Sequence, residues 1–122
     1  MSKKILIVDD AAFMRKLISK TLTEGGFTEI VEADDGFTAC DQYFAEHPDL
    51  VIMDITMPNK SGIEALQEIR QQDPDAKVIM CSAMGQESMV VEAIKLGALD
   101  FVVKPFKPDR MLATVMNILE SE

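Results

Sequence analysis

The chain has 122 residues with 48% hydrophobic and 27% charged residues, a composition that fits one globular domain with one hydrophobic core. Its 21 acidic and 12 basic residues give a formal net charge of −9, which argues against binding to nucleic acid or an anionic membrane because phosphate contacts need Lys and Arg. No apolar run approaches the roughly 20 residues that a membrane span requires, and the N-terminus has no signal-peptide pattern, so we expect a cytoplasmic protein.

The hydrophobic pattern predicts five short apolar strands that alternate with five helices. The expected strands are 4–8, 27–32, 50–54, 77–81 and 99–103. The expected helices are 11–24, 36–46, 63–72, 86–96 and 108–120. Such alternation indicates βαβ units, a parallel sheet and right-handed crossovers, hence an α/β fold, but it does not determine the strand order.

The cysteines and the single histidine limit the kinds of chemistry that the protein can carry out. Cys40 and Cys81 lie in apolar stretches without CxxC or metal-type spacing, so we expect two buried thiols. The single histidine, His47, cannot form a zinc site or a Ser/His triad.

In the helix 36–46 we expect Phe37, Cys40 and Phe44 to be buried.

Chemically active side chains follow four of the five expected strands. Asp9 and Asp10 end the first strand, Asp54 ends the third, Ser82 follows the fourth and Lys104 follows the fifth. Each could be a turn or solvated residue taken alone. Because the carboxyl ends of parallel strands meet at one edge of the sheet, their joint occurrence predicts a common pocket.

This set of side chains suits phosphoryl transfer with a metal ion. Three clustered carboxylates repel one another, and Mg²⁺, which prefers oxygen ligands, relieves the repulsion. An attacking aspartate, Asp54, would form an aspartyl phosphate. The Lys104 ammonium and the Ser82 hydroxyl could bind the remaining phosphoryl oxygens.

The sequence resembles the receiver domain of two-component response regulators over its whole length, so 1–122 is expected to be a single receiver domain. The matching motifs are Ile5–Leu6–Ile7–Val8–Asp9–Asp10, Pro48–Asp49–Leu50–Val51–Ile52–Met53–Asp54, Met57–Pro58 with Gly62, Ser82–Ala83, and Val103–Lys104–Pro105–Phe106. The resemblance implies a flavodoxin-like (βα)5 three-layer sandwich. It also implies the strand order 2-1-3-4-5, which is known from chemotaxis members of this family and does not follow from the pattern.

The resemblance also implies a magnesium site and a phosphorylation site. Asp54 is similar to the family's phosphoacceptor. Asp10, Asp54 and the backbone carbonyl of Thr56 are similar to its direct Mg²⁺ ligands, and Asp9 is expected to act mostly through bound water.

Three further residues take their expected roles from the family. Lys104 would pair with the phosphoryl group, and Ser82 would donate a hydrogen bond to it and move toward it on activation. Phe101, three residues before Lys104, would then turn inward. Serine stands where threonine is frequent, and phenylalanine stands where tyrosine is frequent; the alternative for Phe101 is a plain core aromatic on an edge strand.

The motifs at 10–15 and 81–86 are similar to those of the stand-alone chemotaxis receivers. That branch implies a histidine kinase, a flagellar motor switch protein bound through 86–120, a possible phosphatase, a monomer, and a phosphoacceptor rather than an enzyme. The apolar Met89, Val90, Val91 and Ile94 either form an exposed binding strip or, with only Val91 exposed, belong mostly to the core.

Three other functions remain open from the sequence. A phosphorelay intermediate would pass its phosphoryl group to a histidine phosphotransfer protein. A Mg²⁺-dependent phosphatase is disfavoured, because Thr56 stands where such enzymes usually carry a second acid. The chain could also be a receiver fragment of a longer regulator.

Overall fold

The computed structural model describes residues 3–120 and contains a five-stranded parallel sheet with the order β2-β1-β3-β4-β5. The strands are β1 (Lys4–Val8), β2 (Glu29–Ala33), β3 (Leu50–Asp54), β4 (Val78–Ser82) and β5 (Asp100–Val103). The helices are α1 (Ala12–Glu24), α2 (Gly36–Glu46), α3 (Gly62–Gln72), α4 (Glu87–Lys95) and α5 (Pro108–Glu120). The expected flavodoxin-like α/β fold and its strand order are confirmed.

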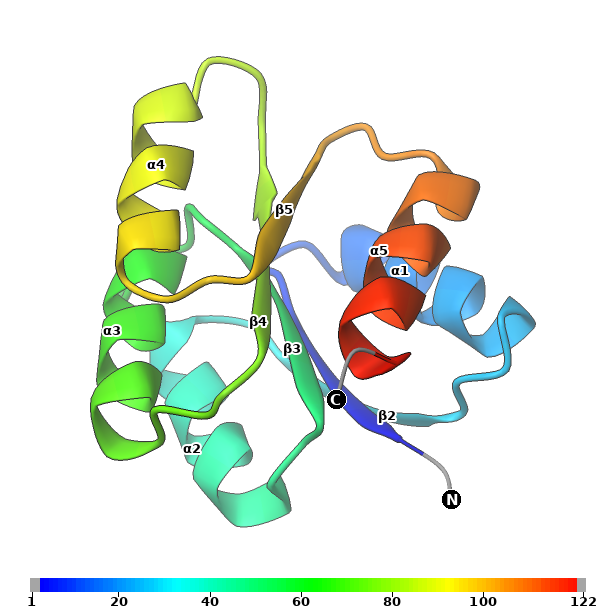
Figure 1. Ribbon diagram of the computed structural model, residues 1–122, viewed down its shortest axis with the longest axis horizontal. Helices are drawn as coiled ribbons and strands as arrows, with labels where there is room; N and C mark the ends of the chain where they lie inside the picture. The colour runs from blue at the N-terminus through cyan, green and yellow to red at the C-terminus, as the bar shows by residue number, and fades with distance from the viewer. Residues whose placement is uncertain (1–2, 121–122) are drawn as a thin grey trace.

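The helices form a layer on each face of the sheet (Figure 1). Helices α2, α3 and α4 cover one face, and α1 and α5 cover the other. No helix within residues 3–120 is long and apolar enough to cross a membrane.

The central strand β3 is buried on both faces, as its unbroken apolar run predicts. Val51 and Met53 belong to the core cluster under α2, α3 and α4, whereas Leu50 and Ile52 belong to the cluster under α1 and α5. Both packed layers therefore fix the strand that ends in Asp54.

The expected boundaries needed small corrections, of which the largest is at β2. This strand begins at Glu29, not at Phe27, because the Phe27 N–H donates to the Leu22 carbonyl and continues the C-terminal turn of α1. It runs on to Ala33, which pairs with Val8 at the end of β1.

The prediction that Phe37 is buried was wrong: its side chain is 55% exposed. The buried face of α2 follows Gly36, Ala39, Cys40 and Tyr43, so Phe37 falls outside it. Its ring instead lies 5.2 Å from the Lys60 ammonium.

The other expectations for the core hold. Phe44 is partly buried against the core, and both thiols are buried and unpaired with each other. Burial raises the pKa of Cys40 to about 11 and that of Cys81 to about 12, so both thiols are protonated at neutral pH.

Candidate functional site

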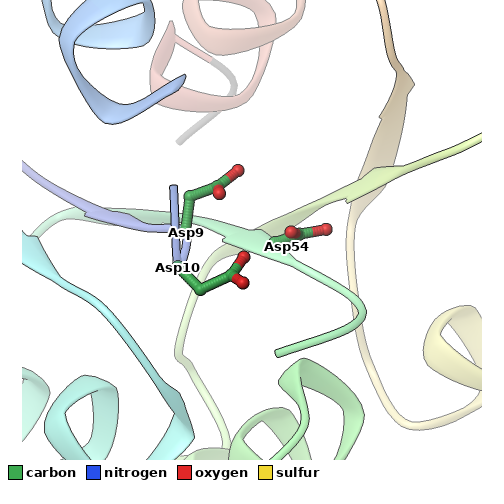
Figure 2. A group of neighbouring side chains, drawn as sticks. All are labelled: Asp9, Asp10 and Asp54. Atoms are coloured by element: carbon green, nitrogen blue, oxygen red, sulfur yellow. The ribbon is translucent and has the colours of Figure 1, made fainter. Parts of the chain in front are cut away.

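Three aspartates lie together at the carboxyl ends of β1 and β3. Asp9, Asp10 and Asp54 each offer a carboxylate oxygen, and these oxygens all lie within 4.8 Å of one another. Figure 2 shows the three side chains leaving the two neighbouring strand ends. Asp9 and Asp54 are buried, at 1% and 8% exposed, while Asp10 is exposed to solvent.

Lys104 brings a positive charge into this cluster from the end of β5. Its Nζ lies 2.8 Å from Asp9 Oδ2 and 3.1 Å from Asp54 Oδ2. Its backbone N–H donates a 2.7 Å hydrogen bond to the Ser82 carbonyl, so the ends of β4 and β5 are joined where the lysine enters the site.

The charges in the cluster do not balance. Burial raises the pKa of Asp54, and the neighbouring Asp9 and Asp10 raise it further, although Lys104 opposes them. Burial lowers the pKa of Lys104, but its contacts with Asp9 and Asp54 outweigh this effect and raise it above the ordinary value. One cation among three acids leaves excess negative charge in a partly buried place.

A hard divalent cation fits this donor set. Mg²⁺ takes oxygen ligands and is commonly bound through one or two carboxylates, with water completing its octahedral shell. Asp10 and Asp54 offer the more accessible oxygens, since both oxygens of Asp9 are engaged, Oδ2 by Lys104 and Oδ1 by the Ala11 N–H, whereas Asp54 contacts Lys104 through Oδ2 alone. The aspartate triad is typical of the magnesium site of receiver domains.

Arg15 is a supporting residue that lies within the motif at 10–15 but was given no role from the sequence. It donates to the backbone carbonyl of Asp9 at 2.6 Å and forms an ion pair with Glu32 at 2.9 Å. These contacts tie α1 and β2 to the end of β1 and hold the Asp9 backbone in place.

Ser82 and Phe101 lie beside an apolar groove between α4 and β5. The groove has a volume of about 660 Å³ and is also lined by Val90, Ile94 and Val103. Ser82 is buried as the last residue of β4, whereas Phe101 is 42% exposed on the edge strand.

Most of the α4 residues that the sequence left open are exposed, and two of them, Val91 and Ile94, share the face that lines the groove. Met89, Val91 and Ile94 are 42%, 54% and 44% exposed, and only Val90 of this group is buried. The alternative in which Val91 alone is exposed is therefore wrong.

The loop after β3 carries Thr56, whose hydroxyl accepts a 2.7 Å hydrogen bond from Gln86 Nε2. Gln86 also accepts the Ala83 backbone N–H through Oε1 at 2.6 Å. The motif at 81–86 includes Gln86, but the sequence assigned it no role, because a single polar residue at the start of a helix has no spacing that reveals its partners.

The same loop is anchored to α2 on its other side. Asn59 Nδ2 donates to Asp35 Oδ2 at 3.0 Å, and the Gly36 N–H donates to the Lys60 carbonyl at 3.0 Å. A Cβ at Gly62 would lie 1.9 Å from the Asp54 carbonyl oxygen, so only glycine permits this close return of the chain.

Comparisons with known proteins agree with this geometry. The model of the response regulator receiver domain matches residues 5–116. The chain is 55% identical to chemotaxis protein CheY of Bacillus subtilis (strain 168), covering 98% of this chain and 99% of that protein, and 51% identical to CheY of Thermotoga maritima, covering 97% and 98%. Its fold superimposes on the receiver domain of NtrX from Brucella abortus with a TM-score of 0.92 and 36% identity, covering 98% and 100% of the two chains.

The chain belongs to the response regulator receiver family. Within that family it is a CheY-like chemotaxis receiver, a phosphoacceptor regulatory protein and not an enzyme of the usual kind. The acidic pocket of Asp9, Asp10 and Asp54 is consistent with the family's phosphorylation site.

The raised pKa of Asp54 predicts that its charge destabilises the metal-free protein. An acid with a raised folded-state pKa stabilises the fold below its unfolded value, near 3.8, and this contribution is lost as pH rises through the folded-state pKa. In EDTA at pH 7, Asp54→Asn should increase the free energy of unfolding by about 1 kcal/mol, because it removes a buried charge that the neighbouring acids repel. Urea denaturation measures this.

The matched control is Asp41→Asn on the exposed surface of α2, which should leave the unfolding free energy within about 0.5 kcal/mol of the native value. The advantage of Asp54→Asn should also shrink as the pH approaches 3.8. Equal or lower stability of Asp54→Asn at pH 7 would contradict the electrostatic assignment.

Proposed function

We propose that Asp54 accepts a phosphoryl group from a histidine kinase and that this modification switches a binding surface on α4, β5 and α5. The observation that supports the proposal most strongly is the position of Asp54. It ends a strand that is buried along its whole length, beside two further carboxylates and a lysine ammonium 3.1 Å away.

In the transfer step an Asp54 carboxylate oxygen attacks phosphorus, a new O–P bond forms, and the P–N bond of the phosphohistidine breaks. Asp10, Asp54 and the Thr56 carbonyl would hold Mg²⁺, with Asp9 acting through water. The ion would supply positive charge that offsets the charge on the phosphoryl oxygens. Lys104 is close enough to Asp54 to pair with another of these oxygens.

The proposed switch uses Ser82 and Phe101. The Ser82 hydroxyl would donate to a phosphoryl oxygen and draw the end of β4 toward Asp54. Phe101 would then turn into the groove of about 660 Å³ that it lines together with Ser82. Since a phosphoryl group binds only one of the two arrangements well, it would shift their populations.

The proposed output is binding to a flagellar motor switch protein through the exposed apolar residues of α4, of which Val91 and Ile94 share the face beside the groove. Flexible Met-bearing apolar surfaces suit binding that can be switched. Relatives named chemotaxis protein CheY support this assignment. A phosphatase that removes the phosphoryl group is a further proposed partner. We also propose that the protein is monomeric and cytoplasmic and consists of one receiver domain.

Phosphorylation is tested by intact mass after incubation with acetyl phosphate. One added phosphoryl group is expected with Mg²⁺, none with EDTA, and none in Asp54→Asn. The control Asp41→Asn should be labelled like the native protein. Because a short-lived adduct could escape detection, binding of beryllofluoride is measured in parallel; labelling of Asp54→Asn, or no response to either probe, would refute the proposal.

The output surface is tested with Val91→Lys, which places a charge on the exposed face of α4 that Val91 and Ile94 share. We expect it to weaken binding of the beryllofluoride-loaded protein to the motor switch protein at least about tenfold, because an unpaired charge is costly at an apolar interface. Isothermal titration calorimetry measures the affinity, and labelling by acetyl phosphate should not change.

The matched control is Gln67→Lys on the exposed face of α3, which should bind like the native protein. Equal affinity of Val91→Lys and the native protein would refute this surface. Rapid phosphoryl transfer to a histidine phosphotransfer protein, without any binding to the switch protein, would replace the motor output with a phosphorelay role.

A further inference from the structure

One side chain joins the two loops that lie on either side of Asp54. Gln86 Nε2 donates to the Thr56 hydroxyl at 2.7 Å, and Gln86 Oε1 accepts the Ala83 backbone N–H at 2.6 Å. Thr56 lies two residues after Asp54, and Ala83 directly follows Ser82. The amide of Gln86 therefore connects the chain just after the end of β3 with the chain just after the end of β4.

The backbone of this loop is arranged to make the bridge. Gly85 has a φ of +90°, a conformation that residues with a Cβ rarely adopt, and it reverses the chain so that Gln86 can return to Ala83. Gln86 is half-buried although Ala83, Met84 and Gly85 before it are all exposed. The loop thus turns inward at Gln86.

The bridge replaces a contact that would stabilise α4. Gln86 occupies the position before the first turn, where a side chain commonly accepts an N–H of its own helix, and α4 has no such side-chain bond. Helices α2 and α3 each begin with a full capping box, formed by Asp35 with Thr38 and by Ser61 with Glu64. At α4 the available side chain instead contacts the neighbouring loop.

The bridge uses hydrogen-bonding groups just beyond the end of the β3–β4 pairing, where Asp54 lies opposite Cys81. The Ala83 N–H is the first backbone donor after Ser82, and a phosphoryl group on Asp54 would present several acceptor oxygens near it. A peptide N–H makes one good hydrogen bond at a time, so the Gln86 oxygen and a phosphoryl oxygen compete for this donor.

We propose that Gln86 is a positioning residue that holds Ala83 and Thr56 in the unphosphorylated arrangement and is displaced when a phosphoryl-sized anion binds at Asp54. The inference rests on the proposed function of Asp54. It adds a residue that restrains the loops on either side of Asp54. The restraint opposes anion binding, since the anion can take the Ala83 amide only when that amide leaves the Gln86 oxygen.

The test measures the affinity for beryllofluoride in saturating Mg²⁺ by ¹⁹F NMR. Gln86→Met keeps the length of the side chain but cannot accept or donate these bonds. It should bind beryllofluoride about three- to tenfold more tightly than the native protein, as expected for losing one or two modest hydrogen bonds. Gln86→Ala, a second variant in case the first folds poorly, should show the same direction.

A second readout reports the bridge without any ligand. Hydrogen exchange of the Ala83 amide should be about tenfold faster in Gln86→Met than in the native protein, because its acceptor is removed. The matched control is Gln67→Met on the exposed surface of α3, which should change neither the exchange of Ala83 nor the affinity for beryllofluoride.

The two hypotheses fail in different ways. If the native protein binds no beryllofluoride, the proposed function of Asp54 fails and the inference fails with it. If the native protein binds it and Gln86→Met binds equally or more weakly, Asp54 keeps its role and the restraint is refuted. Equal exchange of the Ala83 amide in both proteins would also refute the restraint.

Discussion

The contact of the Lys104 ammonium with Asp9 and Asp54 is the interaction on which the site depends. It places one positive charge among three carboxylates at the ends of two adjacent strands. The lysine offsets part of the repulsion, but Asp54 retains a raised pKa because burial and the other acids outweigh it. The remaining negative charge favours a divalent cation, and the lysine favours an anion beside Asp54.

The fold keeps this cluster rigid and leaves its surroundings adjustable. β3 is buried by core side chains on both faces, so Asp54 has a fixed position. The loops that follow β3 and β4 are held by side-chain contacts, such as the hydrogen bonds of Gln86 and Asn59. Such contacts are individually weak, and a bound ligand can replace them.

The ends of β4 and β5 connect the site to a distant surface. Ser82 pairs with Val103 in the sheet, and its carbonyl accepts the Lys104 N–H. Phe101 lies two residues before Val103 on the same edge strand and lines the groove below α4. A movement of Ser82 can therefore be transmitted through the β4–β5 pairing to the exposed apolar residues of α4 and β5.

The sequence predicted the strands and the acidic cluster well. An aspartate directly after a buried apolar run in a parallel sheet must lie at the carboxyl edge of that sheet. Asp9, Asp10 and Asp54 meet at this edge. It predicted β2 less well, since residues 27–28 continue a helix-ending turn that only the pairing of the strands reveals. Burial of Phe37 was wrong because the orientation of α2 depends on its packing partners. The roles of Arg15 and Gln86 could not be predicted although both lie in matched motifs, since each bonds a backbone group that no residue pattern marks.

The charge balance around Lys104 can be measured directly by titrating Mg²⁺ and then beryllofluoride into the native protein and Lys104→Met. Removing the ammonium should tighten Mg²⁺ binding, because a repelling cation has left the acidic cluster, and should weaken beryllofluoride binding at least about tenfold, because the anion loses its partner. Calorimetry gives the first affinity and ¹⁹F NMR the second. Weaker Mg²⁺ binding together with unchanged beryllofluoride binding would show that Lys104 is a structural residue and not the charge on which this site depends.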